Sequence, residues 1–251
     1  MDFAKWASFG VLLVRPGAMV MTTPLFGTPF APTPVRIGMT LMLALVVTPL
    51  VAVPAAAGSD AMLWMVARES AIGFAIGLAV RLIVAMGEGA GQLAGHQVGL
   101  SYGAMLDPQS GVNNSTLSVL YANLTLVLIL LSNAHHDVVR AFISSYAALP
   151  IGAGAVSGTL GATVAQSLTF IFASAFRLAA PIIAVLLVVE VMMGLMSRAA
   201  PSLNLLVVGA PIRLPVGLLV VAASLVALPA LITRLWPHAM DLAAAAALAF
   251  R

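Results

Sequence analysis

The sequence predicts an all-α, polytopic membrane protein, and three observations support this fold class. Of the 251 residues, 62% are hydrophobic and only 8% are charged, whereas soluble domains carry roughly 25% charged residues. The mean hydropathy of +1.11 is correspondingly high. Stretches without any charged residue, such as Ile37–Ser59 and Leu214–Thr233, are long enough for a helix to cross a bilayer, which takes about 20 residues.

Apolar stretches divide the chain into about six predicted helical segments. Charged residues, prolines and turn-forming residues separate these stretches or interrupt them, so several segments are predicted to be kinked or broken. In chain order the segments are Phe3–Met21, Ile37–Val53, Ala61–Met86, Leu117–Ser132, Thr163–Met196 and Ile212–Leu235.

The first three segments are bounded or interrupted by particular residues. The first contains Arg15-Pro16, and four prolines in residues 23–34 prevent a continuous helix after it. The second ends at Pro54 and the turn-like residues 58–60. The third carries charges at Arg68, Glu69 and Arg81 within an otherwise apolar stretch.

The last three segments are more apolar. The fourth contains the dense apolar run of residues 124–131, and the sixth fills the gap before Arg234. The fifth is predicted to be interrupted at Arg177 and Pro181. Charges facing lipid are costly, so Arg81, Glu88, Arg177 and Glu190 are expected to face protein, water or each other.

Composition excludes several other classes of protein. The absence of cysteine excludes a disulfide scaffold, thiol catalysis and thiolate metal sites. No two of the 11 Lys and Arg residues lie within nine positions of each other, which leaves no basic patch for nucleic acid. His135-His136-Asp137 is interpreted as a polar helix end, and neither a metal site, a cofactor site nor a catalytic motif is predicted.

Glycines recur at intervals of four residues across the middle of the chain, at Gly87, Gly91, Gly95, Gly99 and Gly103, with an earlier pair at Gly73 and Gly77. On a helix this spacing forms a strip without side chains. Each glycine costs about 1 kcal/mol relative to alanine, which close packing must offset. The strip predicts either packing within the chain or a surface that another subunit or a translocating chain approaches.

A polar segment from Gln97 to Ser118 separates two very apolar stretches. It contains Asp107-Pro108 and Gly111, which are typical of turns. The segment predicts either a solvated connection or a loop that lines or blocks a water-filled path, with Met105 and Leu106 as apolar contacts.

Short motifs in a specific order extend nearly from end to end of the chain. They are Arg15-Pro16, Pro24-Leu25-Phe26-Gly27, Pro34-Val35-Arg36-Ile37, Glu69-Ser70-Ala71-Ile72-Gly73, the glycine strip, Gly99-Leu100-Ser101-Tyr102, Asp107-Pro108, Asn133-Ala134-His135, Leu149-Pro150-Ile151-Gly152, Pro181, Gly194-Leu195-Met196-Ser197-Arg198, Pro201-Ser202-Leu203-Asn204 and Gly209-Ala210-Pro211-Ile212. In these motifs the chain resembles the FliR family, the export-gate subunits of bacterial type III secretion, and its injectisome counterparts.

The resemblance implies a non-enzymatic subunit of the flagellar export gate in the cell inner membrane and the flagellum basal body. The gate passes unfolded flagellar proteins, and the subunit would be required for flagellum assembly. Residues 1–160 would form a FliP-like four-helix part with a gating loop at about residues 102–116, and residues 161–251 a FliQ-like helical hairpin and C-terminal tail. Implied partners are FliP-type, FliQ-type, FlhB-type and FlhA-type proteins, the exported proteins and membrane lipid, with no nucleic acid.

The resemblance also assigns roles to particular residues. The loop that plugs the gate would comprise Tyr102, Met105, Leu106, Asp107, Pro108, Gly111, Asn113 and Asn114. Arg177, Glu190 and Arg198 would pair with neighbouring subunits rather than carry protons. Two alternatives remain at this point: a gate subunit of an injectisome, and a stand-alone secondary transporter or channel, which the interrupted fifth segment and the charges in apolar runs would also fit.

Overall fold

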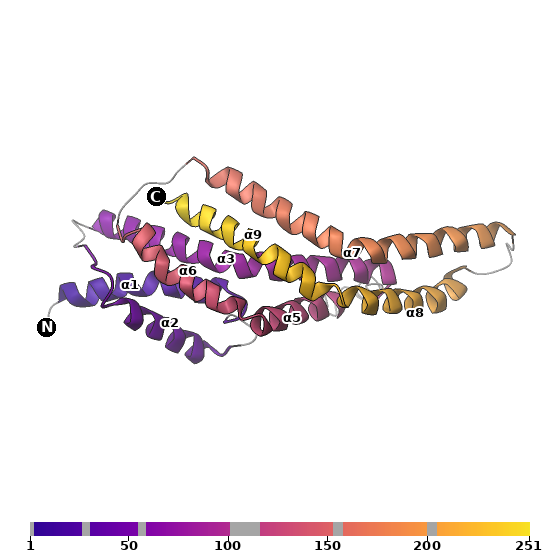
Figure 1. Ribbon diagram of the computed structural model, residues 1–251, viewed down its shortest axis with the longest axis horizontal. Helices are drawn as coiled ribbons and strands as arrows, with labels where there is room; N and C mark the ends of the chain where they lie inside the picture. Colours follow the sequence, from indigo (N-terminus) through magenta and orange to yellow (C-terminus); the bar gives the residue numbers. More distant parts are fainter. Residues whose placement is uncertain (1–2, 27–30, 55–58, 101–115, 153–157, 200–204) are drawn as a thin grey trace. The chain divides into compact units, whose positions relative to one another are not determined.

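The computed structural model describes residues 3–26, 31–54, 59–100, 116–152, 158–199 and 205–251, and every regular element in these ranges is an α-helix (Figure 1). The helices are α1 (Phe3–Thr22), α2 (Thr33–Val47), α3 (Ser59–Val98), α5 (Thr116–Leu131), α6 (Ala134–Ala148), α7 (Leu160–Ala199), α8 (Leu205–Leu225) and α9 (Leu228–Leu248). The predicted all-α class is confirmed.

Within the described ranges, two helices are long and apolar enough to cross a membrane by themselves, namely α3 from Asp60 and α7 from Gly161. Two further candidates are bent pairs: α5 with α6, at 71°, and α8 with α9, at 54°. The structure therefore offers two to four spans, which agrees with a polytopic helical membrane protein whose helices are partly broken.

Two predicted segments are longer or straighter in the structure than the sequence indicated. The third continues beyond Met86 through four glycines to Val98, because a helix tolerates glycine where neighbouring backbone packs against it. The fifth is one helix through Arg177 and Pro181. Proline in an apolar helix is tolerated when neighbouring groups satisfy the backbone that it frees.

The fourth and sixth segments each lead into a second helix that the sequence analysis missed. Between α5 and α6, Asn133 has a left-handed backbone with φ of 58°, a conformation that asparagine adopts more readily than most residues. Between α8 and α9 the helix breaks at Val226-Ala227, and Pro229 lies in the first turn of α9, where a missing N–H costs little.

The chain forms two compact units, and each combines distant parts of the sequence. One unit comprises residues 1–83, 129–168 and 235–251, and the other comprises residues 84–128 and 169–234. In the first unit α1 packs against α2, and Met19, Ile72 and Phe142 are fully buried. In the second unit Tyr121 and Ile182 are fully buried.

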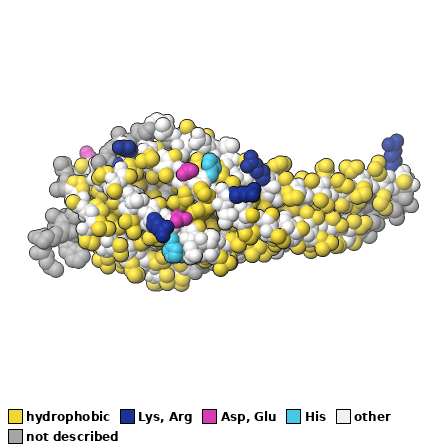
Figure 2. Space-filling view, viewed as in Figure 1, with side chains coloured by type: hydrophobic (Ala, Val, Ile, Leu, Met, Phe, Trp, Pro, Cys, Tyr) yellow, Lys and Arg dark blue, Asp and Glu magenta, His cyan; other side chains and the backbone are white. Residues whose placement is uncertain are grey.

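Large hydrophobic side chains are widely exposed on the surface. On α7, Phe172 is 71% exposed, Val191 is 57% exposed and Leu195 is 63% exposed. Figure 2 shows hydrophobic side chains over most of the visible face, with few charged groups among them. Such a surface is stable when lipid or other apolar helices cover it.

Candidate functional site

The most deeply buried polar site is an ion pair in the first unit between Arg15 of α1 and Glu69 of α3. Both residues are 0% exposed. Arg15 Nε donates to Glu69 Oε2 at 2.7 Å, and Arg15 Nη2 donates to Glu69 Oε1 at 3.0 Å. The two parallel hydrogen bonds give the planar guanidinium a bidentate match to the carboxylate, the strongest geometry for such a pair.

Helix α6 and the residue after it complete this charge cluster. Arg15 Nη1 donates to Ser145 Oγ at 2.9 Å, and Nη2 also donates to the carbonyl oxygen of Leu149 at 2.9 Å. The guanidinium carbon lies 4.0 Å from the centre of the Tyr146 ring, where a cation is attracted to the ring face. The charge cluster of Arg15, Glu69, Ser145, Tyr146 and Leu149 thus connects three helices.

The sequence indicates the Arg15–Glu69 pair only indirectly. Both residues lie inside predicted apolar segments and in motifs of the FliR resemblance, without being predicted as a pair. Opposite charges in two separate apolar segments are expected to meet, because neither is stable alone in an apolar environment. The participation of Ser145 and the Leu149 carbonyl had no such signal.

Two further contacts tie the C-terminal part of the first unit to α3 and α6. Arg68 Nε donates to the carbonyl oxygen of Phe250 at 2.9 Å, and Arg68 Nη1 donates to that of Pro150 at 3.3 Å. Trp236 Nε1 of α9 donates to Asp137 Oδ2 of α6 at 3.1 Å. Side chains therefore join α3 to the residues that follow α6 and α9, and join α6 to α9.

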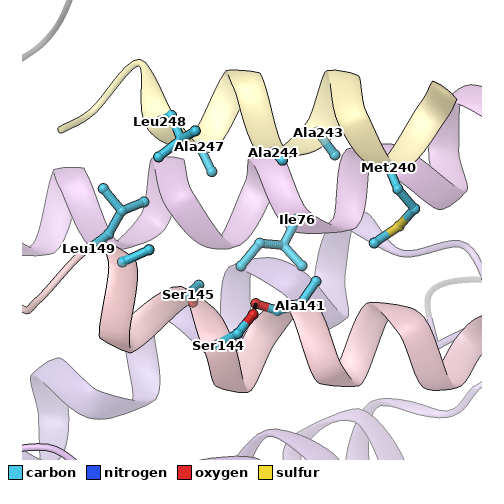
Figure 3. A pocket seen from close by; sticks show the side chains of 11 residues that line it. Ile76, Ala141, Ser144, Ser145, Leu149, Met240, Ala243, Ala244, Ala247 and Leu248 are labelled. Carbon is cyan, nitrogen blue, oxygen red and sulfur yellow. Dashed lines mark hydrogen bonds between the residues drawn. The ribbon is translucent and has the colours of Figure 1, made fainter. Parts of the chain in front are cut away.

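A small apolar cavity lies beside the charge cluster in the first unit, between α3, α6 and α9 (Figure 3). Its volume is about 190 Å³. The lining side chains are mostly small or apolar, among them Ile76, Ala141, Ala244 and Ala247, and the polar ones are the hydroxyls of Ser144 and Ser145. No ionisable side chain lines this cavity, so its lining provides neither an acid–base group nor a charged metal ligand.

Four glycines of the predicted strip lie where α3 meets another helix of the same unit. In the first unit, a Cβ added to Gly73 or Gly77 would lie within 3.0 Å of atoms of α1. In the second unit, a Cβ added to Gly87 or Gly91 would lie within 3.0 Å of atoms of α5, including the Leu117 backbone. At these positions the absence of a side chain lets two helices approach closely within the chain.

The later glycines differ from these four. Gly95 is buried, and its carbonyl oxygen accepts hydrogen bonds from the backbone N–H groups of Gly99 and Leu100. Gly99 has a φ of 94°, which ends α3 in a conformation that glycine adopts without strain. Gly103 lies outside the described residues, and a contact of the strip with another subunit stays a prediction.

The predicted gating loop lies outside the described residues, since all eight of its assigned residues fall within residues 101–115. Both helices that flank this segment are described. Ser118 Oγ of α5 donates to the carbonyl oxygen of Glu88 at 3.0 Å, and Gly91 packs on the α5 backbone. Val98 of α3 lies against Gly217 of α8. The last turns of α3 and the first turn of α5 are therefore anchored within the second unit.

The three charges predicted at subunit contacts lie on α7. Glu190 forms an ion pair with Arg213 of α8 within the chain. Arg177 and Arg198 are exposed, and neither has a carboxylate partner in the part of the chain that the structure describes.

The second unit also holds a buried hydrogen bond of 2.7 Å between the hydroxyl groups of Tyr121 and Ser224.

These features define a helical membrane protein in which buried charges and glycines serve helix packing. In the described ranges, no three His, Cys, Asp or Glu side chains lie close enough together to hold a metal ion. Residues 6–239 match the family model described as bacterial export proteins, family 1. The chain belongs to this family and, within it, to the FliR proteins, so the resemblance noted in the sequence is confirmed.

Several proteins named flagellar biosynthetic protein FliR are similar to the chain over most of its length. The protein of Pectobacterium carotovorum subsp. carotovorum is 30% identical over 245 residues, which are 97% of this chain and 94% of the relative. The protein of Escherichia coli (strain K12) is 29% identical over 84% of this chain and 81% of the relative. That of Bacillus subtilis (strain 168) is 27% identical over 87% of each.

Proposed function

We propose that the chain is a subunit of the flagellar type III export gate and helps to form and close the pore through which unfolded flagellar proteins leave the cytoplasm. The observation that carries this proposal is the similarity to flagellar biosynthetic FliR proteins over nearly the whole chain, 97% of it in one case. The helical membrane architecture agrees with that role. The proposed location is the inner membrane, at the flagellum basal body.

The exposed apolar surface supports a role inside an assembly. Residues such as Phe172 and Leu195 of α7 would be covered by apolar helices of neighbouring subunits. The proposed partners are FliP-type and FliQ-type subunits, with FlhB-type and FlhA-type proteins as further components of the apparatus. Arg198, exposed in the last turn of α7, suits a contact with such a subunit. The same contact for Arg177 and Glu190 stays a prediction, since Glu190 is already paired with Arg213 within the chain.

The proposed role is structural rather than enzymatic. The most buried charged groups, Arg15 and Glu69, have their hydrogen bonds filled by groups of the protein itself. A site arranged in this way fixes helices and leaves no free acid or base for a substrate. In this proposal, the energy for transport is supplied by other parts of the export apparatus.

The segment of about residues 102–116 is proposed as the plug of the resting gate. Support comes from its flanks, because α3 and α5 are anchored to each other near both ends of the segment. Apolar contacts from Met105 and Leu106 would exclude water and ions, and a loop of low local stability could be displaced by a passing polypeptide. Deletion of Gln109–Ser115 should raise ion leakage across the membrane, while unchanged leakage would contradict the plug.

Genetic complementation tests the proposed function directly. Removal of the gene should abolish swimming and the export of flagellar proteins, and the intact chain should restore both. If swimming persists while an injectisome fails to secrete, the chain belongs to an injectisome gate instead. If both persist and the chain purifies as a stable monomer that binds a small solute, it is a stand-alone transporter.

A further inference from the structure

A second cavity, in the second unit, combines apolar walls with two arginines. Its volume is about 280 Å³. Arg177, Leu178 and Pro181 line it from α7, and Ser224, Ala227, Ala230, Leu231 and Arg234 line it from the end of α8, the break and the start of α9. Residues four apart share one face of a helix. One face of α7, with Arg177 and Pro181, and one face of α9, with Ala230 and Arg234, therefore both border this cavity.

The described residues provide neither arginine of this cavity with a compensating charge, because no carboxylate among them forms an ion pair with Arg177 or Arg234. The acidic residue further along α7, Glu190, is occupied by Arg213. The Ser224 hydroxyl is bonded to Tyr121 and to the Val221 carbonyl. Both arginines are exposed residues, so two permanent positive charges border one apolar cavity, where an anion at a membrane surface would be attracted to them.

The position of Arg177 on α7 matches the headgroup level of a membrane. Arg177 and Arg198 are 21 residues apart on one helix, which corresponds to about 31 Å at about 1.5 Å per residue. This equals the hydrocarbon thickness of a typical bilayer, about 30 Å. The two arginines can thus each reach one interface of the bilayer. The helix between them is apolar except for Glu190, which is paired with Arg213.

We propose that Arg177 and Arg234 bind the phosphate group of an anionic membrane phospholipid, whose glycerol and first acyl carbons occupy the apolar part of the cavity. Arginine is the side chain best suited to a phosphate, since its guanidinium offers several fixed donors. Leu178, Pro181 and Leu231 supply the apolar contact that a free phosphate ion would not use. The lipid would fill the space at the break between α8 and α9 and hold α7 against α9 there. This inference goes beyond the export function and requires only that the chain lies in a membrane.

The test measures lipid binding by the full-length protein, purified with whatever subunits accompany it. Phosphatidylglycerol is titrated into the protein in micelles of a non-ionic detergent without phosphate, and retained lipid is counted by native mass spectrometry. Each basic residue near a membrane surface contributes about fivefold in affinity. The double variant Arg177→Gln with Arg234→Gln should therefore bind phosphatidylglycerol about thirtyfold more weakly.

Three further variants separate the site from a general charge effect. Arg198→Gln removes an exposed arginine of the same helix outside the cavity and should leave binding unchanged. Arg177→Lys keeps the charge and should keep most of the affinity. Ala227→Trp fills the cavity from an exposed position without changing charge and should abolish retention, which keeps the test valid if the double variant fails to fold.

Four results would overturn the lipid site. The first is that the double variant binds phosphatidylglycerol as tightly as the unmodified protein, and the second is that Arg198→Gln loses as much affinity as the double variant. The third is that inorganic phosphate competes as effectively as the lipid does. The fourth is that a photo-cross-linker at Leu231 captures a neighbouring protein instead of lipid. Swimming is scored separately. Failure of the intact chain to support export would contradict the proposed function and leave the lipid measurement unaffected.

Discussion

Removing one partner of the Arg15–Glu69 pair should destabilise the first unit strongly. Glu69→Met eliminates both charge-assisted hydrogen bonds to Arg15, each worth about 1.5–3 kcal/mol. It also leaves a fully buried guanidinium without a counter-charge. Both considerations lead to a loss of about 3–5 kcal/mol in the free energy of unfolding, a large fraction of the stability of a typical domain.

Removing both partners together should cost much less than the sum of the single changes. In Arg15→Met with Glu69→Met neither charge of the pair remains, and apolar side chains of similar length fill the space, while the buried Arg68 keeps its hydrogen bonds to the carbonyl oxygens of Phe250 and Pro150. The remaining cost should be about 1–3 kcal/mol, because the Leu149 carbonyl oxygen then loses a hydrogen bond from Arg15. The two single variants and the double variant form a double-mutant cycle whose coupling energy measures the pair.

The assay is denaturant unfolding of the purified chain in detergent micelles, followed by far-ultraviolet circular dichroism. Arg140→Gln is the matched control, because its side chain is 81% exposed and its ion pair with Asp137 spans 3.6 Å; it should change the unfolding free energy by less than about 1 kcal/mol. If Glu69→Met unfolds like the unmodified chain, or if the two single effects simply add in the double variant, the pair does not hold α1 to α3 and the reasoning fails.

Three further predictions concern helix packing and helix breaks. Gly91→Ala should lower the melting temperature, because the added Cβ would meet the α5 backbone. Gly38→Ala is the control: it has open space at its Cβ and should raise stability by up to about 1 kcal/mol. Equal effects of the two substitutions would contradict the close contact at Gly91. Asn133→Ala should cost about 1 kcal/mol because of the positive φ of this residue, while Asn133→Gly should be tolerated, and the two are compared by thermal unfolding. Tyr121→Phe should cost about 1 kcal/mol through loss of the hydrogen bond to Ser224; an unchanged denaturation midpoint would show that this bond does not stabilise the contact of α5 with α8.

The class of fold could be predicted from the sequence because hydropathy is a sum over many residues. Several boundaries could not, because they depend on neighbours that the sequence does not place. Pro181 would end a helix in water, yet α7 continues through it. Helix α6 was not predicted, because His135-His136-Asp137 was interpreted as the polar end of the preceding helix, whereas Asn133 turns the backbone and these residues begin a new helix.

The candidate site was predictable in part for the same physical reason. The spacing of the glycines was visible in the sequence, but which helix meets Gly73 and which meets Gly91 depends on the folded chain. The charges at Arg15 and Glu69 were visible as well, although their pairing is a contact between residues 54 positions apart. The pairing of Glu190 with Arg213 on α8 was not anticipated.

Site-specific photo-cross-linking from α7 in living cells tests the central claim most directly. A cross-linking residue at Phe172, which is 71% exposed, should form adducts with FliP-type or FliQ-type subunits, while one at the fully buried Ile182 should capture only segments of its own chain. If Phe172 forms adducts only with lipid in cells that assemble flagella, the claim that the apolar helices pack among partner subunits of an export gate is contradicted.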